Sequence, residues 1–154
     1  CLGSAAVLDA SKFRPVPRKP SKYHFINLLA VSAFHPRQPR RLADLQHLPP
    51  REKGQWREWL VAQELWRRAA IAGQDAPEQQ YYWKDEAHEV DFIVGPDREE
   101  RHFIEVKSGS ASPGEFSWFP RVFPRGHLRV IGEARFDASF CTGVTHEDFL
   151  LEEG

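Results

Sequence analysis

The chain of 154 residues contains no methionine, only two cysteines and no long hydrophobic run. Because even an initiating Met is missing, we expect a fragment or a processed chain whose upstream part is absent. Cys1 and Cys141 form no C-x-x-C pair, which excludes a disulfide framework and a zinc knuckle. The apolar runs are too short to cross a bilayer, and the first residues lack the basic front of a signal peptide. We therefore expect a cytoplasmic protein with no membrane segment.

Two common kinds of site are also missing. No G-x-x-x-x-G-K-[ST] motif occurs, so the chain has no P-loop for ATP, and its seven histidines show no metal-ligand spacing. What remains is a globular composition, 41 % apolar, which is enough for one domain with a core. The candidate chemistry therefore rests on carboxylates and basic side chains.

Charge is distributed unevenly along the chain. Residues 1–41 hold eight basic residues against Asp9, whereas residues 75–100 hold nine acids against Lys84 and Arg98. A basic arm beside an acidic centre suits nucleic-acid binding near a metal site, and it equally suits an arm that packs on the acids or is solvated. We divide the chain into a basic arm or connector, residues 1–50, as the remnant of an upstream region, and a domain over residues 51–154.

Before residue 75 the sequence predicts mainly helices. A short strand and a helical turn are expected over residues 23–34, another turn over 42–48, and a helix over 54–72 closed by Gly73. At 100° per residue this helix has one apolar face and an opposite charged face. The apolar face holds Trp59, Val61, Ala62, Leu65, Trp66 and Ala69, and the charged face holds Arg57, Glu64, Arg67 and Arg68. Glu58 lies in the middle of the apolar face.

After residue 80 the pattern turns to strands. Strands are expected over residues 81–84, 90–94 and 101–107, with a Gly-Pro-Asp turn joining the last two as a hairpin. A capping box at Ser112 then opens a short helix that Pro120 must stop or kink, before a strand over 128–131 and a last turn beginning at Thr145. The order of elements predicts an α/β layer with a mixed central sheet.

Carboxylates interrupt two of these apolar strands. Asp91 lies between Val90 and Phe92, while Glu105 shares a strand face with Lys107. Together with Glu58, these acids supply three converging oxygen donors, which suit Mg²⁺ or Mn²⁺. A metal-bound water is a better nucleophile, and Lys107 is placed to orient it or to stabilise developing charge. These are the components of a phosphodiester hydrolase.

Structural interpretations of the same residues remain open. Asp91 and Lys107 would then form an ion pair, with Glu105 accepting backbone donors. Arg121, Arg125 and Lys84 are candidates for phosphate contacts, and they equally suit a solvated surface. Five aromatic residues, Trp56, Trp59, Trp66, Tyr82 and Trp83, could stack on bases, although aromatics on a packing helix and strand are usually core.

Several segments together resemble a known family. They are S-K-Y-H-F-I-N-L-L at 21–29, the helix G-Q-W-R-E-W-L-V-A-Q-E-L, Y-Y-W, E-V-D-F, I-E-V-K-S-G and H-E-D-F-L-L near the end. Over residues 20–151 the chain resembles the C-terminal domain of uncharacterised bacterial and archaeal AAA-type ATPases, the domain of unknown function 4143 family. That domain looks like a member of the PD-(D/E)xK nuclease superfamily. The ATPase module and most of the segment that precedes such a domain are absent, and Asn27 stands where we expect Asp.

The resemblance implies a restriction-endonuclease-like αβββαβ core and Mg²⁺-dependent nuclease chemistry. It implies that Asp91, Glu105 and Glu58 are metal ligands and that Lys107 assists catalysis. Our first hypothesis is a divalent-metal-dependent nuclease domain associated with an AAA-type ATPase, acting on DNA rather than RNA. The alternative is a non-catalytic module of the same fold that binds DNA or a protein partner for the ATPase.

Overall fold

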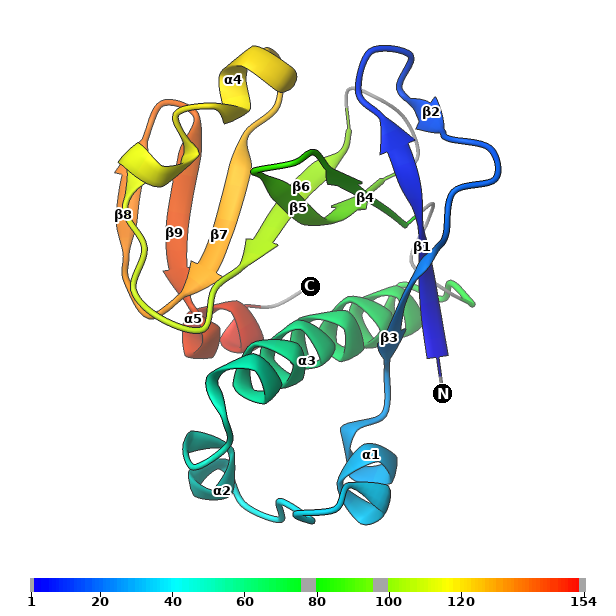
Figure 1. The fold of residues 1–154 in the computed structure, drawn as a ribbon, viewed down its shortest axis with the longest axis vertical. Coiled ribbons are helices and arrows are strands. Elements are labelled where there is room, and N and C mark those ends of the chain that lie inside the picture. Colours follow the sequence, from blue (N-terminus) through cyan, green and yellow to red (C-terminus); the bar gives the residue numbers. More distant parts are fainter. Residues whose placement is uncertain (1, 76–79, 96–99, 153–154) are drawn as a thin grey trace.

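The computed structural model describes residues 2–75, 80–95 and 100–152. Within these residues nine strands form one mixed sheet with helices on both faces (Figure 1). The strands are β1 (Leu2–Asp9), β2 (Arg14–Pro15), β3 (Lys22–Phe25), β4 (Tyr81–Lys84), β5 (Glu89–Val94), β6 (His102–Val106), β7 (Leu128–Gly132), β8 (Phe136–Ala138) and β9 (Cys141–Thr145). The helices are α1 (Leu28–Phe34), α2 (Leu42–Gln46), α3 (Pro50–Ile71), α4 (Phe119–Val122) and α5 (His146–Leu151), with a 3-10 turn η1 (Pro113–Phe116). The expected α/β class with a mixed central sheet is confirmed.

The order across the sheet is β2-β1-β4-β5-β6-β7-β9-β8, with β3 beside β1. Strands β4, β5 and β6 are antiparallel neighbours, and β7 lies parallel to β6. A parallel neighbour requires a crossover, which η1 and α4 provide. Along the chain the elements from α3 to β7 therefore run helix, three strands, helix, strand, in the order expected from the sequence.

The predicted hairpin is confirmed by the antiparallel pairing of β5 and β6, in which Ile93 faces Phe103. Pro96 and Asp97 of the expected turn lie outside the described residues. Gly95 enters the turn with a backbone φ of +136°, and a Cβ added there would lie 2.6 Å from the carbonyl oxygen of Glu100. Only glycine tolerates both conditions, so the turn depends on it.

Side-chain alternation along the strands divides the core into two parts. Phe103 of β6 packs with residues of η1, α4 and the following loop, whereas its neighbour Ile104 packs against Val61 and Ala62 of α3 and Phe149 of α5. We call these the α4-side core and the α3-side core; Figure 1 shows α3 and α5 together, away from α4. The predicted division of β6 between two faces is confirmed.

Helix α3 differs from the sequence prediction at two points. It begins at Pro50, because proline at the first helical position needs no hydrogen-bond acceptor for its nitrogen. Glu64, which we expected on the charged face, is instead 5 % exposed. Arg67 and Arg68 both donate to its carboxylate, at 2.6 and 2.7 Å, and this pairing permits its burial.

The prediction for Pro120 was wrong. The turn opened by the Ser112 capping box is a 3-10 turn that ends at Phe116, before Pro120. Pro120 then lies in the first turn of α4, where its fixed φ favours a helix start and its missing N–H is not needed. The residue therefore begins a helix instead of ending one.

Four strands, β1, β2, β8 and β9, were not predicted, although the final helix was. Thr145 caps α5 by accepting a hydrogen bond from the Asp148 N–H, and the Asp148 carboxylate closes the capping box. Asn27 caps α1 in the same way, since its side chain accepts from the Ala30 N–H.

Among the described residues, none of the helices combines the length and the apolar character needed to span a bilayer.

Candidate functional site

The centre of the candidate site is a lysine that we did not predict. Lys22 of β3 places its Nζ 2.7 Å from Asp91 Oδ1, 2.9 Å from Glu89 Oε1 and 3.0 Å from Glu58 Oε2. These acids come from β5 and α3, so one ammonium group joins three elements. We call Lys22, Glu58, Glu89 and Asp91 the Lys22 cluster.

Asp91 also fixes the end of the neighbouring strand. Its Oδ2 accepts a hydrogen bond of 2.9 Å from the Val106 N–H, and the residue is 4 % exposed. Burial raises the pKa of Asp91, and the negative charge of Glu58 raises it further, while Lys22 opposes both. Asp91 is therefore a buried carboxylate that depends on the ammonium beside it.

Glu105 and Lys107 form a second pair on the α4 side of β6. Glu105 is 6 % exposed, and its Oε1 lies 2.9 Å from Lys107 Nζ. Its Oε2 is buried and has no hydrogen-bond partner among the described residues. Burial and the negative charge of Asp91 raise the pKa of Glu105 well above its usual range, although Lys107 acts in the opposite sense.

Lys107 is the more accessible member of this pair. Its side chain is 37 % exposed, and its Nζ lies 5.6 Å from the centre of the Phe116 ring. Burial disfavours the ammonium, but the carboxylate of Glu105 outweighs that effect and raises the pKa of Lys107. A charged, half-exposed ammonium beside a buried carboxylate is able to meet an anion that approaches from solvent.

The structure brings the predicted acids together in two subgroups. Glu58 and Asp91 share Lys22, whereas Glu105 pairs with Lys107. The structural alternative predicted an ion pair between Asp91 and Lys107. Asp91 does form an ion pair, but its partner is Lys22. Glu105, predicted to accept from backbone donors, pairs with the side chain of Lys107. Among the described residues, no group of three or more His, Cys, Asp or Glu side chains is spaced to hold a metal ion. The Lys22 ammonium lies between Glu58 and Asp91, two of the three acids that we expected to converge.

His24 is a buried residue next to the Lys22 cluster. It is 1 % exposed, its ring centre lies 4.6 Å from that of Phe92, and its Nε2 lies 3.6 Å from Glu58 Oε2. Burial acts to raise the pKa of Glu58, but His24 and Lys22 outweigh it and hold this pKa below its usual range. His24 therefore belongs to the electrostatic environment of the site.

Three of these residues, Lys22, His24 and Glu89, were missed from the sequence. The signal was strand alternation, since Lys22 and His24 are two residues apart in β3, as are Glu89 and Asp91 in β5. The ion pair that joins β3 to β5 was not visible in the sequence, because Lys22 and Asp91 are 69 residues apart. Alternation identifies a face of a strand and does not identify what the face contacts.

The candidate phosphate-binding residues lie outside the Lys22 cluster. Lys84 is exposed and pairs with Glu89 Oε2 at 3.3 Å, so it reaches the cluster only through Glu89. Arg121 is exposed on α4, and Arg125 is exposed on the loop that follows. Of the aromatic residues expected in the core, Trp56 and Trp59 are buried, while Trp66, Tyr82 and Trp83 are half-buried.

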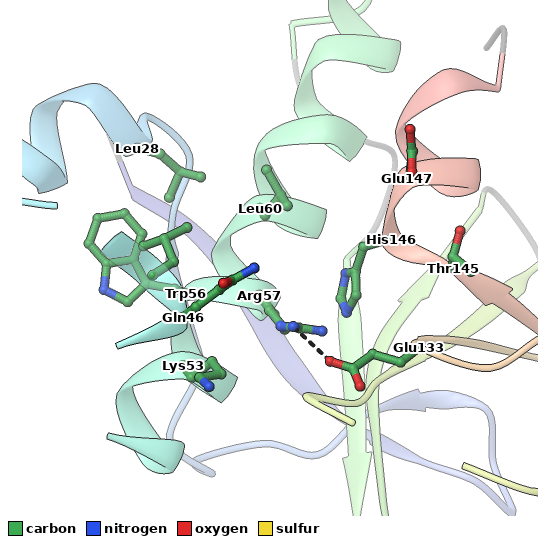
Figure 2. Close-up of a pocket in the computed structure, with 12 residues that line it drawn as sticks. Leu28, Gln46, Lys53, Trp56, Arg57, Leu60, Glu133, Thr145, His146 and Glu147 are labelled. Carbon is green, nitrogen blue, oxygen red and sulfur yellow. Dashed lines mark hydrogen bonds and ion pairs between the residues drawn. The ribbon is translucent and has the colours of Figure 1, made fainter. Parts of the chain in front are cut away.

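A cavity of about 430 Å³ lies between α2, the first half of α3 and the start of α5, and its lining includes no residue of the Lys22 cluster. Figure 2 shows Leu28, Trp56 and Leu60 on one side and His146 on the other, with Arg57 and Glu133 paired between them at 3.0 Å. The Nε2 of His146 lies 3.0 Å from the carbonyl oxygen of Lys107, which links the cavity wall to β6. Burial lowers the pKa of His146, so this ring favours its neutral form.

A family model matches part of the chain. No curated protein and no solved structure matched the chain. Residues 53–128, from the first turn of α3 to the start of β7, match the model of a domain of unknown function, DUF4143. This match supports the family relationship expected from the sequence for that segment, which carries Glu58, Asp91, Glu105 and Lys107.

Proposed function

We propose that this chain is a nuclease-like domain that hydrolyses phosphodiester bonds of nucleic acid with the help of a divalent metal ion. The single observation that carries the proposal is that Oε2 of Glu105 is buried and has no hydrogen-bond partner among the described residues. Oε1 of the same residue is paired with Lys107, and its strand β6 lies next to β5, which carries Asp91. The order helix, three strands, helix, strand from α3 to β7 supports a restriction-endonuclease-like αβββαβ core. The resemblance to ATPase C-terminal domains supports DNA as the substrate and an AAA-type ATPase as the partner.

The donor set fits a hard divalent cation such as Mg²⁺ or Mn²⁺. Such ions are commonly held by one or two carboxylates with waters and substrate phosphates, and Asp91 and Glu105 provide two carboxylates whose pKa values burial raises. Asp91 and Glu105 would hold the ion, with Glu58 as a further or water-mediated ligand. Bound there, the ion would supply a water of lowered pKa and positive charge near the phosphate.

The remaining tasks fall to side chains of this chain. The Val106 N–H holds Asp91 Oδ2 in place, and Lys22 holds Asp91 Oδ1. Lys107 keeps its proton because Glu105 stabilises the ammonium, so it can orient a water or bind a phosphate oxygen as negative charge develops. Glu105 thus has two roles, since one oxygen is paired with Lys107 and the other is available for a cation.

Cleavage of single-stranded and plasmid DNA in Mg²⁺ or Mn²⁺ tests the proposal. We expect Glu105→Gln and Lys107→Ala to lower the rate by at least about 100-fold, the scale of losing one electrostatic group. The control is Lys19→Ala, an exposed lysine outside the site, which should cleave as the wild type does. Cleavage that persists in Lys107→Ala, or that needs no metal, contradicts the assignment.

The Lys22 cluster favours one alternative, a non-catalytic module that binds DNA or a protein partner for the ATPase. In this case the ammonium of Lys22 is the permanent counter-charge of Glu58, Glu89 and Asp91. The thermal unfolding midpoint with and without divalent ions separates the two functions. A midpoint that rises with Mg²⁺ or Mn²⁺ in the wild type and not in Glu105→Gln supports the metal site. No response in either protein, together with binding and no turnover, supports the module.

A further inference from the structure

A second cavity, of about 420 Å³, lies beside the first residues of β6, at the end of the strand opposite Lys107. Its walls come from the loop after β1, the first residues of β6, and the segment joining α4 to β7. The residues used below are Ala10, Phe13, Phe103, Phe123 and Arg125. Neither the Lys22 cluster nor the pair Glu105–Lys107 lines this cavity.

Three phenylalanine rings form the apolar part of the wall. Phe13 meets Phe103 and Phe123 edge to face, each with ring centres 6.3 Å apart, and Phe103 and Phe123 are tilted with centres 4.7 Å apart. The volume is of the scale of small-ligand pockets, which begin at roughly 300 Å³. An aromatic cavity of this size suits a flat, aromatic group.

Phe13 is held there in an unusual backbone conformation. Its φ is +56°, in the left-handed region, and its N–H donates to the Asp9 carbonyl at 2.7 Å. The guanidinium of Arg101 lies 4.7 Å from the centre of the Phe13 ring. Residues kept in such conformations are concentrated at binding sites, where the surrounding structure stabilises the strain.

The surroundings of the cavity are basic. Lys12 and Arg14 flank Phe13 and are exposed, Arg125 lines the cavity and is exposed, and Arg121 is exposed on α4. Asp9, the acid that precedes Ala10 of the cavity wall, accepts hydrogen bonds from the N–H groups of Ser11 and Lys12. An occupant with a flat aromatic group and negative charges matches both properties of the cavity.

We propose that this cavity receives a base of a single-stranded nucleic acid, with the flanking phosphates on Lys12, Arg14, Arg121 and Arg125. Bases stack on aromatic side chains without strong sequence preference, and a basic groove follows the backbone. A duplex keeps its bases stacked and paired, so only an unpaired base enters. The inference rests on the proposed function, because it assigns the substrate class of that site.

The position of the cavity connects it to the candidate site. Phe103 and Glu105 are two residues apart on the same face of β6, which separates them by about 7 Å along the strand. This face of β6 is covered by η1 and α4, and the half-exposed Lys107 follows the strand at the end opposite the cavity. Stacking in the cavity would select unpaired segments for presentation to Glu105 and Lys107.

Fluorescence anisotropy with labelled oligothymidylate, oligouridylate and a DNA duplex tests the inference. The titrations contain EDTA, so cleavage does not interfere. We expect the wild type to bind single strands more tightly than the duplex, with the two oligonucleotides distinguishing DNA from RNA. The variant Ala10→Phe fills the cavity without removing a core side chain, and we expect it to weaken single-strand binding about tenfold or more, as for the loss of one stacked base.

Charge variants and controls complete the test. Arg121→Ala and Arg125→Ala should each lower the slope of log affinity against log salt by about one. The matched control is Arg51→Ala, an exposed arginine at the start of α3, which should leave the slope unchanged. Figure 1 shows α3 away from α4. Should Ala10→Phe fail to fold, as judged by its unfolding transition, Phe13→Leu replaces it and should also weaken binding.

The inference is overturned if the wild type binds neither oligonucleotide, if it binds the duplex as tightly as the single strand, or if the folded cavity variant binds like the wild type. Cleavage is measured separately. Binding that depends on the cavity, without cleavage, contradicts the proposed hydrolysis and leaves the inference intact. Cleavage by a protein whose cavity variant binds normally contradicts only the inference.

Discussion

Four polar side chains, those of His24, Glu64, Asp91 and Glu105, are buried among the described residues. Burying an ionised group is costly unless a partner of opposite charge replaces the lost water. Each of the three acids has such a partner: two arginines for Glu64, Lys22 for Asp91 and Lys107 for Glu105. Of these three acids, only Glu105 has an oxygen without a hydrogen-bond partner in the part of the chain that the structure describes.

At the residue scale, Lys22→Met tests the Lys22 cluster. The substitution leaves Glu58, Glu89 and Asp91 crowded without their shared cation, so we expect the free energy of unfolding in urea to fall by about 3 kcal/mol. The control Lys19→Met removes an exposed lysine and should change stability by less than about 0.5 kcal/mol. Equal losses in the two variants would contradict the central role of Lys22.

The ion pairs of Glu64 predict a pH dependence. Burial acts to raise the pKa of Glu64, but Arg67 and Arg68 outweigh it and hold the pKa below its usual value of 4.5. The unfolded chain therefore binds a proton at a higher pH than the folded chain does. The stability that Glu64 contributes is complete above its unfolded pKa and is lost as the pH falls through the lower, folded pKa.

Urea titrations at about pH 7 and about pH 3 measure this contribution. At neutral pH we expect Glu64→Gln to cost about 2 kcal/mol, the scale of hydrogen bonds to a charged group. Toward pH 3 the variant should lose less stability than the wild type. Glu86→Gln, on an exposed residue, should follow the wild-type profile, and an unchanged profile in Glu64→Gln would refute the prediction.

At the element scale, α3 connects the parts of the molecule. Its first half packs Trp56 and Trp59 with Val31 of α1, while its second half packs Val61 and Ala62 beneath the sheet. Glu58 lies between these contacts and reaches Lys22. A helix that must be buried along several sides shows a weaker amphipathic pattern than a surface helix, which explains why Glu64 was misplaced.

Gly54 is a position in α3 where a substitution should increase the stability of the protein. A Cβ added at Gly54 has no atom within 4 Å, so Gly54→Ala should stabilise the protein by about 0.5–1 kcal/mol through helix propensity. Gly132→Ala in β7 is the matched contrast, because its Cβ would lie 2.9 Å from the Gly109 carbonyl oxygen. Thermal unfolding of both variants should give shifts of opposite sign; two shifts of the same sign would contradict the steric argument.

At the scale of the whole molecule, the first 25 residues are part of the sheet. β1 lies parallel to β4 through Ala6 and Val7, and β3, which carries Lys22, pairs with β1. The acidic residues of α3 and β5 thus obtain their counter-charge from the basic N-terminal segment. The charge asymmetry was interpreted either as a nucleic-acid-binding arm or as an arm that packs on the acids or is solvated. Lys22 packs on the acids.

This arrangement predicts that residues 51–154 alone do not form a stable domain. Without β1 and β3, β4 loses its parallel neighbour, and Glu58, Glu89 and Asp91 lose Lys22. We expect the shortened chain to lack the cooperative urea transition of the full chain, as measured by tryptophan fluorescence. A cooperative transition of equal midpoint would show that residues 51–154 fold independently.

The sequence by itself determined the elements whose signals are local. Short runs of apolar, β-branched and aromatic residues predicted β4, β5 and β6, capping patterns predicted the start of α5, and the 3.6-residue period predicted most of α3. It also singled out Glu58, Asp91, Glu105 and Lys107 as charges within apolar surroundings. The predictions of these strands and helices succeeded because each depends on residues that are neighbours in the chain.

Only the tertiary structure decided which charges meet. Lys22 reaches Asp91 because β1 places β3 against α3 and β5, and this pairing joins segments 69 residues apart. The burial of Glu64 and the short strands β8 and β9 also depend on distant contacts. Ion pairs and strand pairing join residues that are distant in the sequence, so spacing along the chain could not assign Lys22 to Asp91. For the same reason it could not predict that one oxygen of Glu105 has no partner among the described residues.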